Sequence, residues 1–269
     1  MTVAERGGAT RIAGAFSSAR GLAALMPYVM GGFPTLEQSR LIGEACVEGG
    51  ADVIELGVPY SDPLADGPVI QAAGTQALRA GADLAGVLEV ARALSQSVPV
   101  VLMCYANVVF APGAEAFLER LARTGASGLI VPDLPQEEAS DLLAASDEAG
   151  VALVPLAAPT TTDERMAAIG AHARGFLYAV SVVGTTGERR DLSASAREMI
   201  ARAKAHTRVP VALGFGIATP AHARQAADAG ADGVIVGTRL VRAAAESREP
   251  AQAVGALVAE LAAGLARDR

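Results

Sequence analysis

Two carboxylates in one short segment could perform acid–base chemistry. The segment reads Glu55-Leu-Gly-Val-Pro-Tyr-Ser-Asp-Pro-Leu-Ala-Asp-Gly-Pro68, and Glu55 ends an apolar run that is typical of a buried strand. Burial disfavours an ionised carboxyl, so we expect a raised pKa for Glu55. Asp66 follows on a proline-rich loop, where we expect a polar setting and an ionised carboxylate. Such a pair suits proton transfer in both directions, although an isolated strand-end glutamate can also simply cap a loop.

Short apolar runs recur along the chain and must position these carboxylates. Each run is continuous rather than alternating, as in parallel strands that are covered on both faces. Amphipathic stretches separate the runs, and several of these stretches end at a glycine, such as Gly150 or Gly230. The pattern predicts an α/β fold, a single (β/α)8 TIM barrel; a doubly wound open sheet is the alternative but seldom repeats so evenly. The eight predicted strands are 28–30, 53–56, 100–103, 128–131, 152–155, 176–180, 211–213 and 233–236.

Additional helices are expected outside this repeat. Residues 9–25 favour an N-terminal helix before the first strand, and residues 66–98, after the second strand, favour two helices that break around 81–83. The tail 250–269, after the eighth strand, has a helical apolar face and should pack against the last strand–helix unit. We expect residues 1–269 to form one barrel domain, with residues 1–8 flexible.

The mouth of the predicted barrel is where the chemistry should take place. Active sites of such barrels are built at the C-terminal ends of the strands. If Glu55 points into the barrel, Val53 and Gly57 do so as well, whereas Ile54 and Leu56 face the helices. Polar or aromatic residues that follow other strands should converge on the same mouth; they are Tyr105, Asn107, Asp133, Tyr178 and Phe215.

Glycine clusters follow the three last strands. They are Gly184-Thr-Thr-Gly187, Gly214-Phe-Gly216 and Gly237-Thr238. Glycine lets backbone N–H groups approach an anion, and the start of a helix adds a favourable dipole. Any one cluster could merely shape a tight turn, but three in adjacent loops favour phosphate binding.

Composition and charge exclude several classes of function. The chain has 269 residues and a net charge of −7, and it shows no basic stripe for nucleic acid. No apolar run approaches the roughly 18 residues of a membrane span, and the charged N-terminus makes a poor signal peptide. Cys46 and Cys104 lack metal-type spacing, which favours a reduced, cytoplasmic protein.

The positions of the lysine and the histidines argue against two classes of catalytic mechanism. The single lysine, Lys204, falls in a helical stretch, so a Schiff base inside the barrel is excluded. His172, His206 and His222 also fall in helices or at helix ends, which argues against a histidine-bound metal. A phosphorylated ligand handled by carboxylates, without lysine, metal or organic cofactor, remains.

The segment 55–68 resembles the signature of the tryptophan synthase alpha subunit family. Further matches follow in the family's order, at residues 26–28, 105–107, 131–135, 184–187, 214–216 and 236–238. The resemblance implies a (β/α)8 barrel that cleaves indole-3-glycerol phosphate to indole and glyceraldehyde 3-phosphate. This retro-aldol reaction makes the chain a carbon–carbon lyase of tryptophan biosynthesis, without a cofactor of its own.

Residue roles follow from the same resemblance. Glu55 matches the residue that transfers both protons, and Asp66 matches the carboxylate that accepts a hydrogen bond from the indole N–H. The loop 181–192 should close over the ligand, with Thr186 contacting Asp66. The phosphate cradle is matched by Gly187, Gly216, Gly237 and Thr238, and the walls of the indole pocket by Tyr28, Tyr105, Tyr178 and Phe215. The chain departs from the family in Thr185, where a valine is usual, and in Thr238, which replaces a serine.

A partner is also implied: a pyridoxal-phosphate beta subunit that consumes the indole in an αββα heterotetramer. Residues 59–68 and 133–135 should form the contact face, and the isolated chain should be slow. Three alternatives stay open from the residues. They are a stand-alone indole-3-glycerol phosphate lyase that releases free indole, an isomerase or epimerase of a sugar phosphate, and a non-catalytic activator of a beta subunit.

Overall fold

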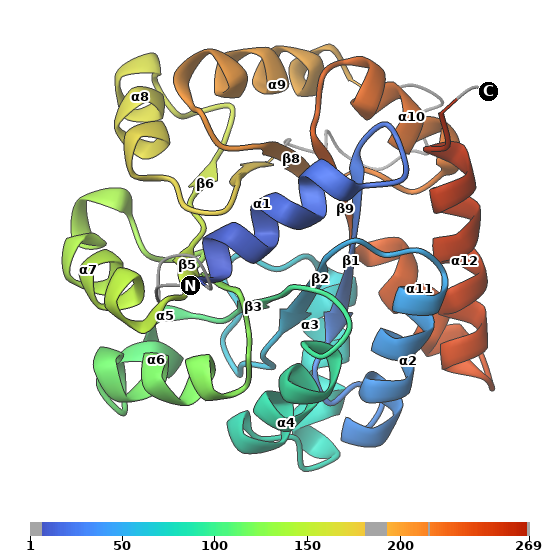
Figure 1. Ribbon diagram of the computed structural model, residues 1–269. Helices are drawn as coiled ribbons and strands as arrows, with labels where there is room; N and C mark the ends of the chain where they lie inside the picture. The colour runs from blue at the N-terminus through green and yellow to red at the C-terminus, as the bar shows by residue number, and fades with distance from the viewer. Residues whose placement is uncertain (1–6, 181–192, 215, 268–269) are drawn as a thin grey trace.

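The computed structural model describes residues 7–180, 193–214 and 216–267 (Figure 1). Within these ranges, nine parallel strands form one sheet in the order β5-β4-β3-β2-β1-β9-β8-β7-β6. The strands are β1 Ala24–Met30, β2 Ile54–Gly57, β3 Val100–Met103, β4 Gly128–Ile130, β5 Ala152–Leu153, β6 Leu156–Ala157, β7 Leu177–Val180, β8 Val211–Gly214 and β9 Gly233–Val236.

The ninth strand arises because the fifth predicted run is split. Pro155 lies between β5 and β6, and proline has no N–H to donate to a strand ladder. The two halves keep different neighbours: Val154 N donates to Leu129 O at 2.9 Å, and Tyr178 N donates to Pro155 O at 3.0 Å. The two outer strands of the sheet are therefore consecutive in the chain, and the sheet closes on itself. The predicted (β/α)8 barrel is confirmed.

Helices cover the outside of the sheet, as Figure 1 shows. Inward-facing side chains, including Val53, Val101 and Phe176, form one buried cluster inside the barrel. Ile54 and Leu56 belong to a second cluster, against the helices, as the alternation along β2 predicted. The surrounding helices are α2 Leu36–Glu48, α3 Pro68–Arg79, α4 Leu84–Leu94, α5 Ala106–Phe110, α6 Ala114–Arg123, the 3-10 helix η2 Gln136–Glu138, α7 Ser140–Ala149, α8 Asp163–His172, α9 Ala194–His206, α10 Pro220–Asp228 and α11 Thr238–Glu246.

A left-handed glycine stops α7 before β5. Gly150 has φ 70°, and its N–H and that of Val151 both donate to Ser146 O. A side chain would be strained in this conformation, so glycine ends the helix at low cost. The predicted glycine cap is confirmed, and the break around 81–83 between α3 and α4 is confirmed as well.

The N-terminal helix is shorter than predicted. The helix α1 spans Gly8–Ser18, not 9–25. It ends early because Gly21 pairs with Ala266 and Leu22 N donates to Leu265 O at 2.8 Å, which draws the chain into an extended conformation before β1. Gly8, expected within a flexible start, is buried and donates its N–H to Gly150 O at 2.7 Å.

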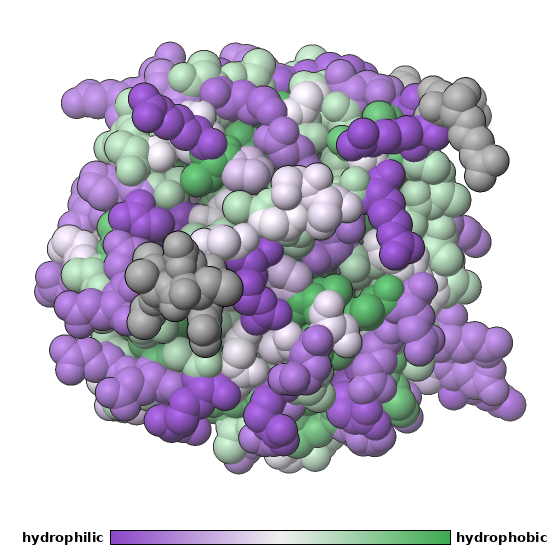
Figure 2. Space-filling view, viewed as in Figure 1, coloured by the Kyte–Doolittle hydropathy of each residue, from purple (hydrophilic) through white to green (hydrophobic). Residues whose placement is uncertain are grey.

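The helix α1 lies across the N-terminal end of the barrel (Figure 1). Its Ile12 is fully buried in the inner cluster, and the Phe16 ring lies 5.7 Å from that of Phe176. Less polar residues gather near the centre of this face, and hydrophilic residues dominate its periphery (Figure 2). The tail forms α12, Pro250–Gly264, which packs against α11 as predicted and also against α2 and α10. Among the described helices, none is long and apolar enough to cross a membrane.

Candidate active site

Glu55 lies at the centre of the candidate site. It stands on β2, in register with Tyr28 on β1 and Val101 on β3, and its side chain is 1% exposed. Its Oε2 atom has no hydrogen-bond partner within the described part of the chain. Burial, and secondarily the charge of Asp66, raises the pKa of Glu55 to about 8. The predicted raised pKa is confirmed in its direction and its cause.

Two buried tyrosines flank Glu55, and two glycines make room for them. Burial raises the pKa of Tyr28 and that of Tyr178, and the negative charges of Glu55 and Asp66 raise both further. A Cβ at Gly57 would lie 2.0 Å from the Tyr28 hydroxyl, and one at Gly214 would lie 2.3 Å from the Tyr178 ring. Gly214 therefore accommodates an aromatic ring, a role that its place in a glycine cluster did not indicate.

Asp66 lies next to Tyr105, from the loop after the neighbouring strand β3. The Tyr105 hydroxyl accepts the N–H of Ala65, the residue before Asp66, at 3.0 Å. Asp66 was expected in a polar setting, but its side chain is half-buried. Burial raises the pKa of Asp66, and the nearby Tyr105 hydroxyl opposes this shift without cancelling it. Burial also raises the pKa of Tyr105, to about 12.

Tyr60 is a member of this group that the sequence did not single out. Its ring stacks on that of Tyr105, with centroids 5.0 Å apart and planes 22° apart. The one signal in the sequence was an aromatic residue in the same loop as Asp66. Asp133 contacts the segment after β3: its Oδ1 accepts the Ala106 N–H at 2.8 Å and so anchors the start of α5, the helix that holds Asn107.

The start of α11 is open to an anion. Gly237 occupies the N-cap position and Thr238 begins the helix, and no side chain caps it. The start of α10, in contrast, is capped by Thr219, whose Oγ1 accepts the His222 N–H at 3.2 Å. An uncapped helix start offers N–H donors and a favourable dipole to a phosphate. Gly216, in the loop after β8, has φ 84°.

Three of the predicted contacts, Thr186, Gly187 and Phe215, lie outside the described residues, as does the loop 181–192. In the described remainder, no group of three or more His, Cys, Asp or Glu side chains could hold a metal ion. Cys46 and Cys104 are buried and unpaired by disulfide, and burial raises the pKa of both thiols.

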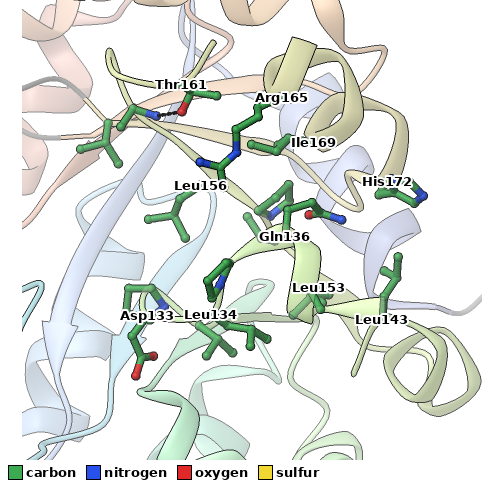
Figure 3. A pocket seen from close by; sticks show the side chains of 18 residues that line it. Asp133, Leu134, Gln136, Leu143, Leu153, Leu156, Thr161, Arg165, Ile169 and His172 are labelled. Atoms are coloured by element: carbon green, nitrogen blue, oxygen red, sulfur yellow. Dashed lines mark hydrogen bonds between the residues drawn. The ribbon is translucent and has the colours of Figure 1, made fainter. Parts of the chain in front are cut away.

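A cavity of about 400 Å³ lies beside the split strand, between η2, α7 and α8 (Figure 3). Its lining is mostly apolar, and Leu143, Leu153 and Ile169 contribute to it. Arg165 also lines the cavity, and its guanidinium pairs with Glu137 at 2.9 Å. The lining contains neither Glu55 nor Asp66, so this cavity is separate from the carboxylate site.

The fold and the site together define a (β/α)8 barrel with a buried carboxyl group of raised pKa on one of its strands. The family model described as Tryptophan synthase alpha chain matches residues 15–267. The chain belongs to the tryptophan synthase alpha chain family.

Individual relatives agree with this assignment. The tryptophan synthase alpha chain of Methanosarcina acetivorans is 48% identical over 242 residues, which are 90% of this chain and 88% of the relative. A tryptophan synthase structure from Mycobacterium tuberculosis matches with a TM-score of 0.89 and 42% identity, covering 96% of this chain and 99% of that one. A chain of the tryptophan synthase α2β2 complex of Pyrococcus furiosus matches with a TM-score of 0.85 and 36% identity, covering 90% and 98%.

Proposed function

We propose that Glu55 is the general acid and base of this family's reaction, the cleavage of indole-3-glycerol phosphate to indole and glyceraldehyde 3-phosphate. The observation that carries the proposal is the buried carboxyl of Glu55, with a pKa of about 8 beside Asp66. Such a group is largely protonated at neutral pH and is well matched to proton transfer in both directions.

The two transfers of Glu55 balance over one turnover. The protonated carboxyl gives its proton to C3 of the indole ring, which leaves positive charge on the ring. The carboxylate then takes the proton of the side-chain hydroxyl, and the C3–carbon bond breaks as the aldehyde forms. Indole and glyceraldehyde 3-phosphate leave, and Glu55 is again protonated.

Asp66 accepts a hydrogen bond from the indole N–H and stabilises the positive charge that develops on the ring. A fixed carboxylate aimed at developing charge contributes most in a site that excludes water. The half-buried position of Asp66 supports this role, as does the nearby Tyr105 hydroxyl, which favours the charged form of the carboxyl.

The remaining residues bind the two ends of the substrate. The uncapped start of α11 favours a phosphate at Gly237 and Thr238, with Gly216 and Gly187 in the adjacent loops. The buried rings of Tyr28, Tyr105 and Tyr178, with Phe215, wall the indole. Thr186 contacts Asp66 when the loop 181–192 closes.

A beta subunit that holds pyridoxal phosphate consumes the indole in an αββα assembly, so the alpha chain itself holds no cofactor. The contact face includes residues 59–68 and 133–135. Leu64, in the first of these segments, is 90% exposed, well above the other exposed large apolar side chains of the described chain, and this supports a contact there. Free cysteines favour a cytoplasmic setting, and residues 1–269 form one domain.

Replacing Glu55 by Gln tests the proposal. We expect Glu55→Gln to lower indole release by about 10²- to 10⁴-fold, because the amide cannot exchange the proton while the side chain keeps its size. Release is measured with purified chain alone and with a beta subunit, which should accelerate the wild type. Equal rates for the wild type and the variant would contradict the role of Glu55. A wild-type chain with no activity in the presence of its partner would contradict the reaction itself.

A further inference from the structure

The turn that ends at Asp66 is held by a side chain from the next helix. Residues 63–66 form this turn, which is closed where the Asp66 N–H donates to Pro63 O at 3.4 Å. The Gln71 side chain, from α3, donates through Nε2 to the same Pro63 O at 3.2 Å and to Asp66 O at 2.8 Å. One amide group therefore bonds both ends of the turn.

The distances show which contacts decide the shape of the turn. Hydrogen bonds between N–H and oxygen usually span about 2.7–3.2 Å, so the bond of 3.4 Å that closes the turn is weak by itself. Both bonds from Gln71 lie within the usual range. A side-chain amide has two N–H donors, and its oxygen cannot donate, so two carbonyl acceptors require the nitrogen to face the turn. Both donors of Gln71 are thus used on this one turn.

These bonds fix the backbone on both sides of Asp66. The peptide group before Asp66 donates to Pro63 O, and the peptide group after it accepts from Gln71. One peptide earlier, the Ala65 N–H donates to the Tyr105 hydroxyl at 3.0 Å. The direction in which a side chain leaves its Cα atom follows from the two peptide groups beside it. Gln71 therefore helps to set the direction in which the Asp66 side chain starts.

We propose that Gln71 is a positioning residue for this site: its amide holds the turn 63–66 in one conformation and so fixes the backbone from which the Asp66 side chain starts. Gln71 touches no reacting atom in this account. Its effect on catalysis rests on the proposed function of Asp66, whereas its effect on the turn does not.

Nitrogen-15 relaxation of the turn tests the positioning without any activity. Gln71→Met keeps a long, unbranched side chain with a similar helix propensity and removes both donors. We expect the order parameters of the Leu64 and Asp66 N–H groups to fall from about 0.85, the value of a rigid backbone, to below about 0.6. Unchanged order parameters in Gln71→Met would overturn the proposal.

Indole release by the full chain tests the catalytic part. A turn that samples several conformations places Asp66 correctly for only part of the time. We therefore expect Gln71→Met to lower kcat by about two- to tenfold, the factor that corresponds to one net hydrogen bond. KM should change less, because positive charge develops on the indole only in the transition state. Gln71→Glu keeps the shape of the side chain but its carboxylate cannot donate, so kcat should fall in this variant as well.

The two measurements separate this proposal from the proposed function. A wild-type kcat in both Gln71 variants would overturn the positioning role, even if the order parameters fall. If the wild type releases no indole but Gln71→Met still lowers the order parameters, the proposed function fails and the effect of Gln71 on the turn stands.

Gln76→Met provides a matched control. Gln76 is also an exposed glutamine of α3, and its side chain forms no hydrogen bond within the described part of the chain. We expect this variant to keep the order parameters of the turn and the kcat of the wild type. Losses as large as those of Gln71→Met would overturn the proposal, because any change on the exposed face of α3 would then have the same effect.

Discussion

At the scale of single residues, the site depends on a carboxyl group that the fold keeps out of water. Glu55 occupies a strand position where an apolar residue would pack without penalty, and it retains an Oε2 atom with no partner in the described part of the molecule. Burial therefore has a cost in stability whenever Glu55 must ionise. The same cost produces the raised pKa that acid–base catalysis requires.

This cost predicts a dependence of stability on pH. The pKa of Glu55 is about 8 in the folded chain and 4.5 as its ordinary value, so between these values the folded state holds a proton that the unfolded state has lost. Proton binding at Glu55 therefore stabilises the folded state fully below about pH 4.5, and this stabilisation is lost as the pH rises towards 8. Because glutamine does not titrate, the free energy of unfolding of Glu55→Gln relative to the wild type should increase by about 3 kcal/mol between pH 5 and pH 8. Urea unfolding at both pH values measures this difference, and a constant difference would contradict the raised pKa.

At the scale of elements, α1 closes the end of the barrel that lies opposite the site. Its Ile12 side chain is fully buried in the inner cluster. A Cβ added at Gly128 would lie 3.2 Å from the Ile12 Cδ1 atom, and one added at Gly175 would lie 2.9 Å from it. Such close approach to two glycine backbones shows how tightly Ile12 fills the end of the barrel.

We therefore expect Ile12→Ala to lower the free energy of unfolding by about 2–5 kcal/mol, because it leaves a cavity in a packed interior. The KM for indole-3-glycerol phosphate should stay near the wild-type value, since the proposed phosphate and indole contacts follow the C-terminal ends of the strands. Urea unfolding and steady-state kinetics measure the two quantities. Ala13→Ser, at the exposed neighbouring position, is the control, and an equal loss of stability in this control would argue against specific packing of Ile12.

The elements also show what the sequence could predict. Apolar runs and helix-ending glycines were enough to place all eight strand regions, because burial on both faces of a parallel strand leaves an unbroken apolar run. The split at Pro155 and the early end of α1 were missed, because each depends on a partner far along the chain: Leu129 and Tyr178 for the split strand, and the segment at Ala266 for α1. Periodicity contains no information on such contacts.

Prediction of the site had the same limit. Glu55 and its raised pKa followed from an acid at the end of an apolar run. The stack of Tyr60 on Tyr105, and the fit of Tyr178 over Gly214, join loops or strands that are separated in sequence and appear only in three dimensions. The polar setting expected for Asp66 was incomplete, because that carboxyl is partly buried in the folded chain.

At the scale of the whole molecule, the loop at residues 59–68 connects the catalytic mouth with the surroundings. It presents Leu64 to solvent, with 90% of its surface exposed, two residues before Asp66. Covering an exposed leucine with a partner removes apolar surface from water and so makes the binding free energy more favourable. A partner that contacts this loop would therefore act within a few residues of Asp66, the proposed charge-stabilising carboxylate.

We expect Leu64→Ser to weaken binding of the beta subunit about tenfold, the loss that follows when about 1.5 kcal/mol of apolar burial is removed. Calorimetric titration of the two subunits measures the affinity, and indole release by the isolated variant should be unchanged. Leu22→Ser is the control, because Leu22 is 39% exposed just before β1, at the opposite end of the barrel. If both variants bind the partner as the wild type does, the loop does not belong to the contact face.

The pairing of Gly21 with Ala266 makes the described chain almost a ring. Leu22 and Leu265 extend the pairing, so the stretch that enters β1 and the stretch that leaves α12 are already joined by hydrogen bonds. Each strand–helix unit then has a neighbour on both sides, and no unit is first or last in space. The geometry of the barrel therefore does not dictate which unit comes first in the sequence, and circularly permuted orders of the same units are compatible with the same barrel.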